Sequence, residues 1–246
     1  MAMHVLLPRQ PLPSVLMQES ILIIKKYSDM DAFFTVRFGI KIMEALACLA
    51  GFLCWAKLSP RFWRAFPFYL LIITCCEFAG WYMNGHGIKG SRAMYSYFVI
   101  PLEFLFMHFL YYKNLPRYFR KTVIGLSAIY VAALFAEQLF LQQVKWIWLS
   151  MSYTIGNITL LVLGIIYFLQ LFSSEKIADY KRQLFFWVNL GLMLFYVGTC
   201  PYYAMFKTLY ETQPALFHAL AWVSVILNYV MYGFFIIGFL WSRKER

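Results

Sequence analysis

Two carboxylates lie near the middle of long apolar stretches of the sequence, Glu77 in TCCEFAGWYM and Glu103 in IPLEFLF. An ionisable side chain in such a stretch is costly, so it usually faces other helices or a cavity and often carries function. We identify no lysine or arginine at a comparable depth to pair with either acid. If the two acids approach each other, they can share a proton or hold a cation between them. The alternative is that both are protonated and hydrogen-bond to tyrosines or carbonyls as contacts between helices.

Pro101 and His108 flank Glu103 and are secondary candidates. Pro101 has no N–H to donate to the Tyr97 carbonyl, so we expect a kinked or loosened helix just outside Glu103. His108 follows Glu103 by five residues, about 140° around a helix, so the two side chains do not share a face. We therefore expect His108 to be a structural histidine that meets Tyr111 or Tyr112.

Polar side chains recur along single faces of three later apolar stretches. The candidates for a binding or coupling site on these faces are Tyr153 and Asn157, Asn189 and Tyr196, and Asn228 and Tyr232. An amide directed toward lipid would be unsatisfied, so these faces are expected to point inward. Packing contacts between helices explain any one face alone. Three such faces and two acids together predict a polar, aromatic-walled interior.

The composition places these residues in a lipid bilayer. Hydrophobic residues make up 62% of the 246 and charged residues 13%, and a soluble chain of this length could not bury so much apolar surface. The net charge of +11 resides in short loops between apolar stretches, which is typical of topology signals and lipid headgroup contacts rather than of nucleic-acid binding. The five cysteines all lie in apolar stretches, so we expect no disulfide framework, metal site or cofactor.

The apolar stretches predict an all-α protein with seven transmembrane helices. The expected spans are residues 33–56, 66–84, 94–112, 122–140, 147–172, 183–206 and 215–241. Lysine and arginine number 3, 2, 4, 1, 3 and 1 in the six loops between them, and 3 in the tail SRKER. By the positive-inside rule, loops one, three and five and the C-terminus are cytoplasmic and the N-terminus is outside.

The two ends of the chain flank this domain of residues 33–241. Residues 1–32 are either a short interfacial segment outside the membrane or an extension upstream of a true start at Met30. Residues 242–246 form a basic cytoplasmic tail. At the outer end of the first span, we expect Lys41 to pair with Glu44 and Arg37 to extend to the headgroups.

Several familiar classes do not fit the sequence. Retinal proteins need a lysine near the middle of the last helix, and residues 215–241 contain none. A zinc-dependent intramembrane hydrolase needs several histidines with a paired HxxxH, which this chain also lacks. An enzyme is therefore not the favoured reading.

Two resemblances bear on the fold. The topology is similar to that of seven-helix sugar transporters and PQ-loop proteins, which are built from parallel repeats. PLEFLFMHF (101–109) aligned with ILNYVMYGF (226–234) would make Glu103 and Asn228 symmetry mates facing one site. The pattern of EF, PLEFLF, LFFWVNLGLMLFYVG and a terminal FLWSRKER resembles an uncharacterised family of small bacterial seven-helix membrane proteins. That resemblance implies a bacterial inner-membrane location and no established activity.

These observations favour a protein of the bacterial inner membrane that binds and transports a small solute or cation, with Glu77 and Glu103 as binding or coupling acids. A membrane sensor or partner subunit is the first alternative, which would contact a protein partner through the loops KNLPRYFRK or SSEKIADYKR. An intramembrane enzyme acting on a lipid is the second.

Overall fold

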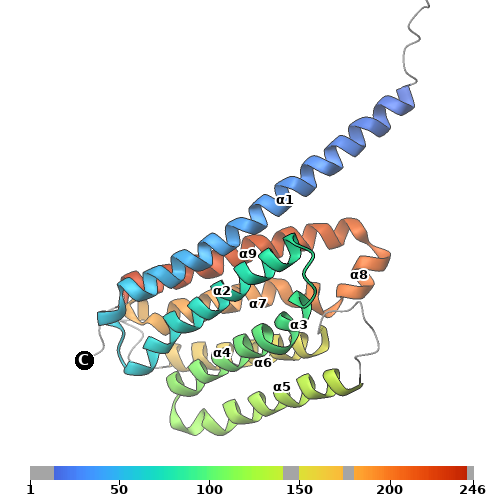
Figure 1. Cartoon of the computed structure of the whole chain (residues 1–246). Helices are drawn as coiled ribbons and strands as arrows, with labels where there is room; N and C mark the ends of the chain where they lie inside the picture. The colour runs from blue at the N-terminus through green and yellow to red at the C-terminus, as the bar shows by residue number, and fades with distance from the viewer. Residues whose placement is uncertain (1–13, 141–149, 174–179, 243–246) are drawn as a thin grey trace, which may run out of the picture. The chain divides into compact units, whose positions relative to one another are not determined.

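Helices account for nearly all of the chain, as the repeated apolar stretches predict. The computed structural model describes residues 14–140, 150–173 and 180–242, and these contain no strand. In chain order (Figure 1) the helices are α1 (Ser14–Leu53), α2 (Ala65–Gly85), α3 (Ser91–Met94), α4 (Ile100–Asn114), α5 (Arg120–Phe140), α6 (Ser150–Phe172), α7 (Leu184–Ala204), α8 (Phe206–Thr212) and α9 (Pro214–Trp241). Short 3-10 turns occupy Trp55–Lys57, Arg61–Arg64 and Arg117–Phe119, and a π-helical turn at Tyr95–Val99 joins α3 to α4.

Five helical stretches among the described residues are long and apolar enough to cross a membrane, which indicates a multi-pass membrane protein. They are Arg61–Gly85, Arg117–Leu139, Met151–Phe172, Leu184–Ala204 and Pro214–Trp241. The first and third predicted spans are helical but do not belong to this set. The first contains the ionisable residues Arg37, Lys41 and Glu44, and α4 has only 15 residues.

The predicted boundaries agree with α2, α5, α7 and α9 to within two residues at each end. The fifth predicted span agrees at its end, while residues 147–149 lie outside the described part of the chain. The first helix starts at Ser14 rather than at residue 33, because residues 14–38 contain no glycine or proline that would interrupt it. Residues 1–13 and 243–246 also lie outside the described part, so the proposed roles of both ends stay predictions.

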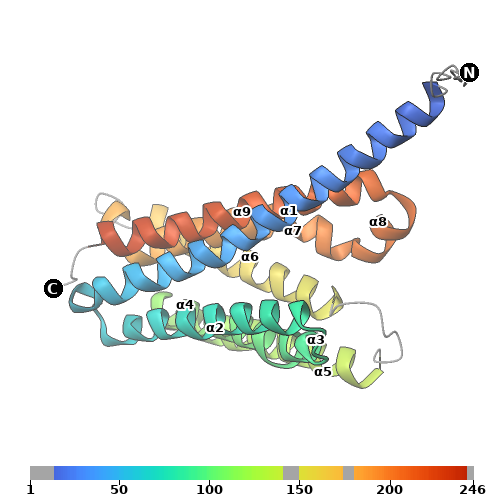
Figure 2. The ribbon, with the colours of Figure 1, turned by 45° about the horizontal axis from the view of Figure 1, so that its top comes forward.

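The chain divides into two units, Met1–Phe38 and Gly39–Arg246, and the described part of the first is the beginning of α1. In the second unit, α9 packs along α7, α7 along α6 and α6 along α5, while α4 contacts both α5 and α6 (Figures 1 and 2). The stacked rings of Tyr69 and Phe106, 4.1 Å apart, join α2 to α4. A Cβ at Gly51 would lie 2.8 Å from Pro67 and 3.1 Å from Phe239, so α1 packs closely on α2 and α9. These contacts close the bundle.

Aromatic rings fill the middle of this bundle. Phe104 of α4 is fully buried, and its ring centroid lies 4.9 Å from Tyr130, 5.2 Å from Tyr153 and 5.8 Å from Tyr196. Gly156 of α6 makes room for this ring, because a Cβ there would lie 2.5 Å from it. Rings from α4, α5, α6 and α7 therefore meet at the turn that carries Glu103.

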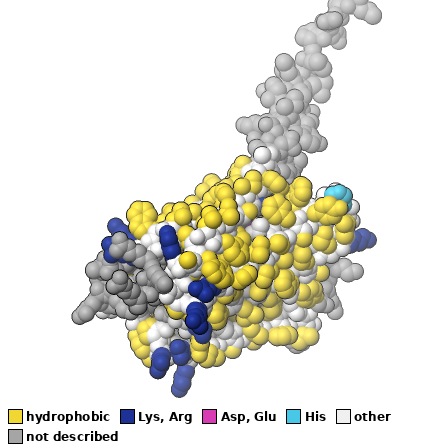
Figure 3. Space-filling view, turned by 60° about the vertical axis from the view of Figure 1, so that its left-hand side comes forward, with side chains coloured by type: hydrophobic (Ala, Val, Ile, Leu, Met, Phe, Trp, Pro, Cys, Tyr) yellow, Lys and Arg dark blue, Asp and Glu magenta, His cyan; other side chains and the backbone are white. Residues whose placement is uncertain are grey.

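The outer surface is apolar, as a bilayer requires. On the face shown in Figure 3, hydrophobic side chains cover most of the described surface, and lysine and arginine gather mainly at one end. Large apolar side chains such as Leu139, Leu53 and Leu169 are 74%, 76% and 60% exposed. Such a surface would be unstable in water and matches the hydrocarbon interior of a membrane.

Glu137 of α5 caps the start of α6. Its buried carboxylate accepts hydrogen bonds from the backbone N–H groups of Met151, at 3.1 Å, and Ser152, at 2.7 Å. The first N–H groups of a helix have no partners within the helix and favour a negative charge. A carboxylate from a neighbouring helix therefore satisfies them and fixes α5 against α6.

We expect Glu137→Ala to lower the free energy of unfolding by about 1–3 kcal/mol, because it leaves two N–H groups without their charged acceptor. Chemical denaturation of the purified protein in detergent measures this change. Glu211→Ala, at an exposed position on α8, is the matched control and should have little effect. Equal stability of the two variants would contradict the capping role.

Candidate functional site

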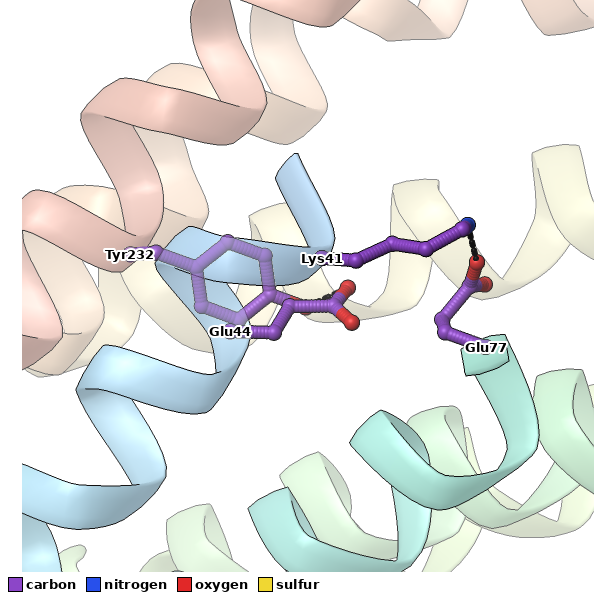
Figure 4. A network of polar contacts seen from close by, with 4 residues as sticks. All are labelled: Lys41, Glu44, Glu77 and Tyr232. Atoms are coloured by element: carbon purple, nitrogen blue, oxygen red, sulfur yellow. Dashed lines mark hydrogen bonds and ion pairs between the residues drawn. The ribbon is translucent and has the colours of Figure 1, made fainter. Parts of the chain in front are cut away.

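Lys41 of α1 forms an ion pair with Glu77 of α2 (Figure 4). Lys41 Nζ lies 2.6 Å from Glu77 Oε2, and the two side chains are 12% and 23% exposed. The prediction that no basic residue lies at the depth of Glu77 is therefore wrong. So is the expected pairing of Lys41 with Glu44, because the long lysine side chain reaches across to the neighbouring helix instead.

Glu44 of α1 is a third buried acid. It is 5% exposed, and its Oε1 accepts a hydrogen bond of 2.8 Å from the Tyr232 hydroxyl of α9 (Figure 4). Its other oxygen, Oε2, is buried and has no hydrogen-bond partner among the described residues. The sequence predicts Tyr232 as a site residue but Glu44 only as a partner of Lys41, so the bond between Glu44 and Tyr232 is not expected from it.

The depth of each residue, counted from the nearest end of its predicted span, could have indicated both the Lys41–Glu77 pair and the role of Glu44. Lys41 and Glu44 lie 8 and 11 residues after the predicted start of the first span at 33. Glu77 lies 7 residues before the predicted end of the second span at 84. At 1.5 Å per residue, these positions are about 10–17 Å from the same surface. Charged residues at similar depth on antiparallel neighbouring helices can therefore be predicted to lie close together.

Glu103 of α4 is joined to α7. The Tyr196 hydroxyl, on a side chain that is 1% exposed, donates a hydrogen bond of 3.1 Å to Glu103 Oε1. Both residues are sequence candidates, and the structure brings them together. Among the described residues, Glu103 makes no direct hydrogen bond to Glu77.

Glu103 lies in the first turn of α4, two residues after Pro101. The turn before it, Tyr95–Val99, is π-helical, and the Ile100 N–H donates to the Tyr95 carbonyl across five residues. Proline lacks the N–H that an α-helix would need at residue 101, so a wider turn precedes it. The predicted loosening of the helix outside Glu103 is thus present.

We refer to Lys41, Glu44, Glu77 and Glu103 together as the acid cluster. The charges of Glu77, Lys41 and Glu103 act on Glu44, and the charge of Glu77 acts on Glu103. The charge of Glu103 also acts on the buried hydroxyl of Tyr153 of α6. The cluster therefore joins side chains of α1, α2 and α4 in one electrostatic unit beside the tyrosines of α6, α7 and α9.

The three asparagine candidates have separate environments. Asn189 of α7 is fully buried, and its Oδ1 accepts a hydrogen bond of 2.5 Å from Tyr111 of α4. Asn228 donates to the Ser224 carbonyl one turn earlier in α9, at 3.0 Å. Asn157 of α6 is fully buried, and neither amide atom has a hydrogen-bond partner among the described residues. Asn189 thus joins α7 to α4 through its oxygen, while its Nδ2, like both amide atoms of Asn157, has no hydrogen-bond partner among the described residues.

His108 is buried, but its partners differ from the expected ones and its Nε2 has no hydrogen-bond partner among the described residues. Its Nδ1 donates a hydrogen bond of 2.7 Å to the Phe104 carbonyl one turn earlier, since a carbonyl oxygen can only accept. Its ring stacks on Tyr130 of α5, with centroids 6.0 Å apart. The expected contact with Tyr111 or Tyr112 is replaced by this contact between α4 and α5.

The acid cluster does not have the geometry of a metal cage. Across residues 14–140, 150–173 and 180–242, no group of three or more histidine, cysteine, aspartate or glutamate side chains is arranged to hold a metal ion. Searches against protein-family models, curated proteins and solved structures give no match for this chain.

Proposed function

We propose that this chain is a seven-helix inner-membrane protein, with its N-terminus outside, that binds and transports a small solute or cation at the acid cluster. The observation that carries the proposal is the charge imbalance of the cluster. Of the three carboxylates inside the apolar bundle, Glu77 forms an ion pair with Lys41, whereas Glu44 and Glu103 bond to tyrosine hydroxyls.

Charge neutrality determines what such a cluster can bind. Burying an uncompensated charge costs several kcal/mol, so a buried carboxylate takes up a proton or finds a cation. Lys41 can balance one of the three carboxylates. The other two require two protons or positive charge from a bound ligand. A bound proton and a bound cation at the cluster are therefore alternatives, so cation binding releases protons, which is the basic requirement for coupled transport.

The hydrogen bonds of the cluster connect this exchange to helix packing. Glu103 joins α4 to α7 through Tyr196, and Glu44 joins α1 to α9 through Tyr232. The Lys41–Glu77 ion pair joins α1 to α2. A ligand that displaces one of these partners changes a contact between helices, so occupancy of the site can shift the bundle between two conformations.

The direct test is flux through the wild-type protein in liposomes. The full chain is reconstituted in vesicles, proton flux is followed with an enclosed pH-sensitive dye, and uptake of Na⁺, K⁺ and methylammonium is followed with the radiolabelled ions. We expect at least one of these ions to cross faster than in protein-free vesicles. Equal rates for all four ions with and without protein would contradict the proposal.

Two narrower statements stay predictions alongside this one. The first is membership of the uncharacterised bacterial seven-helix family. The second is the relation between Glu103 and Asn228 as repeat mates, which receives no support from a contact, since Asn228 bonds within its own helix.

A further inference from the structure

A groove of about 270 Å³ lies between α4 and α5, which run side by side in Figure 1. It is lined by Leu105, His108, Phe109 and Tyr112 of α4 and by Val123, Ile124 and Ser127 of α5. Leu105, Phe109 and Ile124 are 42%, 36% and 57% exposed, so the groove opens toward the outside of the bundle. In a membrane, that surface faces lipid chains.

Two cations lie at the end of the groove near the turn between α4 and α5. Lys113 Nζ is 5.6 Å from the centre of the Phe109 ring, and Arg120 Cζ is 5.1 Å from the Tyr112 ring. Both rings line the groove, so the charges are fixed beside it. The Nε atom of Arg120 is buried and has no hydrogen-bond partner among the described residues.

The surrounding turn strengthens this positive charge. Residues 113–121 read KNLPRYFRK, with four basic residues and no acidic one, and Arg117 and Lys121 are exposed. Because α4 ends at Asn114 and α5 begins at Arg120, the predicted topology places this turn at the membrane surface. The groove thus has an apolar channel along the helices and a cationic end at the membrane surface.

We propose that this groove binds one anionic phospholipid, with an acyl chain against Leu105, Phe109 and Ile124 and the phosphate at Lys113 and Arg120. The volume is below the ~300–1,000 Å³ of pockets that enclose a whole small molecule, so the open groove can hold part of one acyl chain. The guanidinium of Arg120 offers N–H donors that match a phosphate, including the unpartnered Nε. This site is separate from the acid cluster and does not depend on the transport proposal.

Native mass spectrometry of the full chain in detergent tests the site, with phosphatidylglycerol and phosphatidylcholine of identical acyl chains as probes. We expect one phosphatidylglycerol to be retained in preference to phosphatidylcholine. Lys113→Gln/Arg120→Gln should weaken that retention by about fivefold for each charge removed. Ser127→Phe, which places a ring in the groove, should weaken retention of both lipids.

Arg61→Gln/Arg64→Gln is the matched control. Arg64 also lies over an aromatic ring, with its Cζ 5.5 Å from the Trp55 ring centre, and this pair removes the same two charges. The control should retain phosphatidylglycerol like the wild type. Equal retention of the two lipids, or equal loss in the control pair, would overturn the proposal. A dimer that Ser127→Phe dissociates while lipid retention is unchanged would also overturn it.

Discussion

Glu103→Gln is expected to reduce the proton- or cation-dependent flux of the reconstituted protein by about 10- to 100-fold while leaving the protein folded. Glutamine keeps the size of the side chain and an oxygen that can accept the Tyr196 hydrogen bond, but it can neither release a proton nor neutralise a cation. A hydrogen bond to a charged group contributes about 1.5–3 kcal/mol, which corresponds to that range of affinity. The measurement is the initial rate of ion flux into liposomes that contain the protein.

The same substitution at Glu77 and at Glu44 should also reduce flux, because the three charges act on one another. Glu211→Gln, at an exposed position on α8, should transport like the wild type. Tyr196→Phe separates the charge from its hydrogen bond and should reduce flux less than Glu103→Gln. Unchanged flux in all three glutamine variants of the cluster would exclude a coupling role.

Lys41→Met is expected to lower the free energy of unfolding by about 2–4 kcal/mol. Breaking a buried ion pair typically costs about 3–5 kcal/mol. Glu77 can take up a proton once Lys41 is removed, which reduces that cost. The double variant Lys41→Met/Glu77→Gln should regain most of the loss, because it leaves no unpaired charge. Denaturant titrations of the single and double variants in detergent measure the coupling energy between the two residues.

Lys207→Met, on the exposed surface of α8, serves as the control for removing a lysine. It should change stability by less than about 0.5 kcal/mol. If Lys41→Met behaved like this control, or if the effects of Lys41→Met and Glu77→Gln simply added, the ion pair would not stabilise the bundle.

The positions of the helices follow from the sequence because hydrophobicity and helix length both reflect the thickness of the membrane. The inward direction of Glu103, Tyr196 and Tyr232 follows in the same way, since each polar group needs a partner inside the bundle. The start of α1 does not follow, because hydropathy marks where a helix enters lipid and not where its hydrogen bonds begin.

The partner of each acid is harder to predict, because it depends on the rotation of each helix about its axis and on the depth of each helix in the membrane. Glu44 and Lys41 are three residues apart on one helix, and local spacing favours a pair between them. In the bundle, Glu77 of α2 and Tyr232 of α9 compete for these side chains and form the observed contacts instead. The sequence of a single protein contains no direct information about which of these competing contacts forms.

The π-helical turn at Tyr95–Val99 determines how α4 is rotated about its own axis. A π-turn holds one residue more than an α-turn, and each residue of an α-helix advances about 100° around the axis. Everything after the turn is therefore rotated by about that angle from where an uninterrupted helix would place it. Shortening the turn by one residue would point Glu103 away from Tyr196 and bring a neighbouring apolar side chain into its place. A single backbone insertion thus determines which side of α4 faces the other acids.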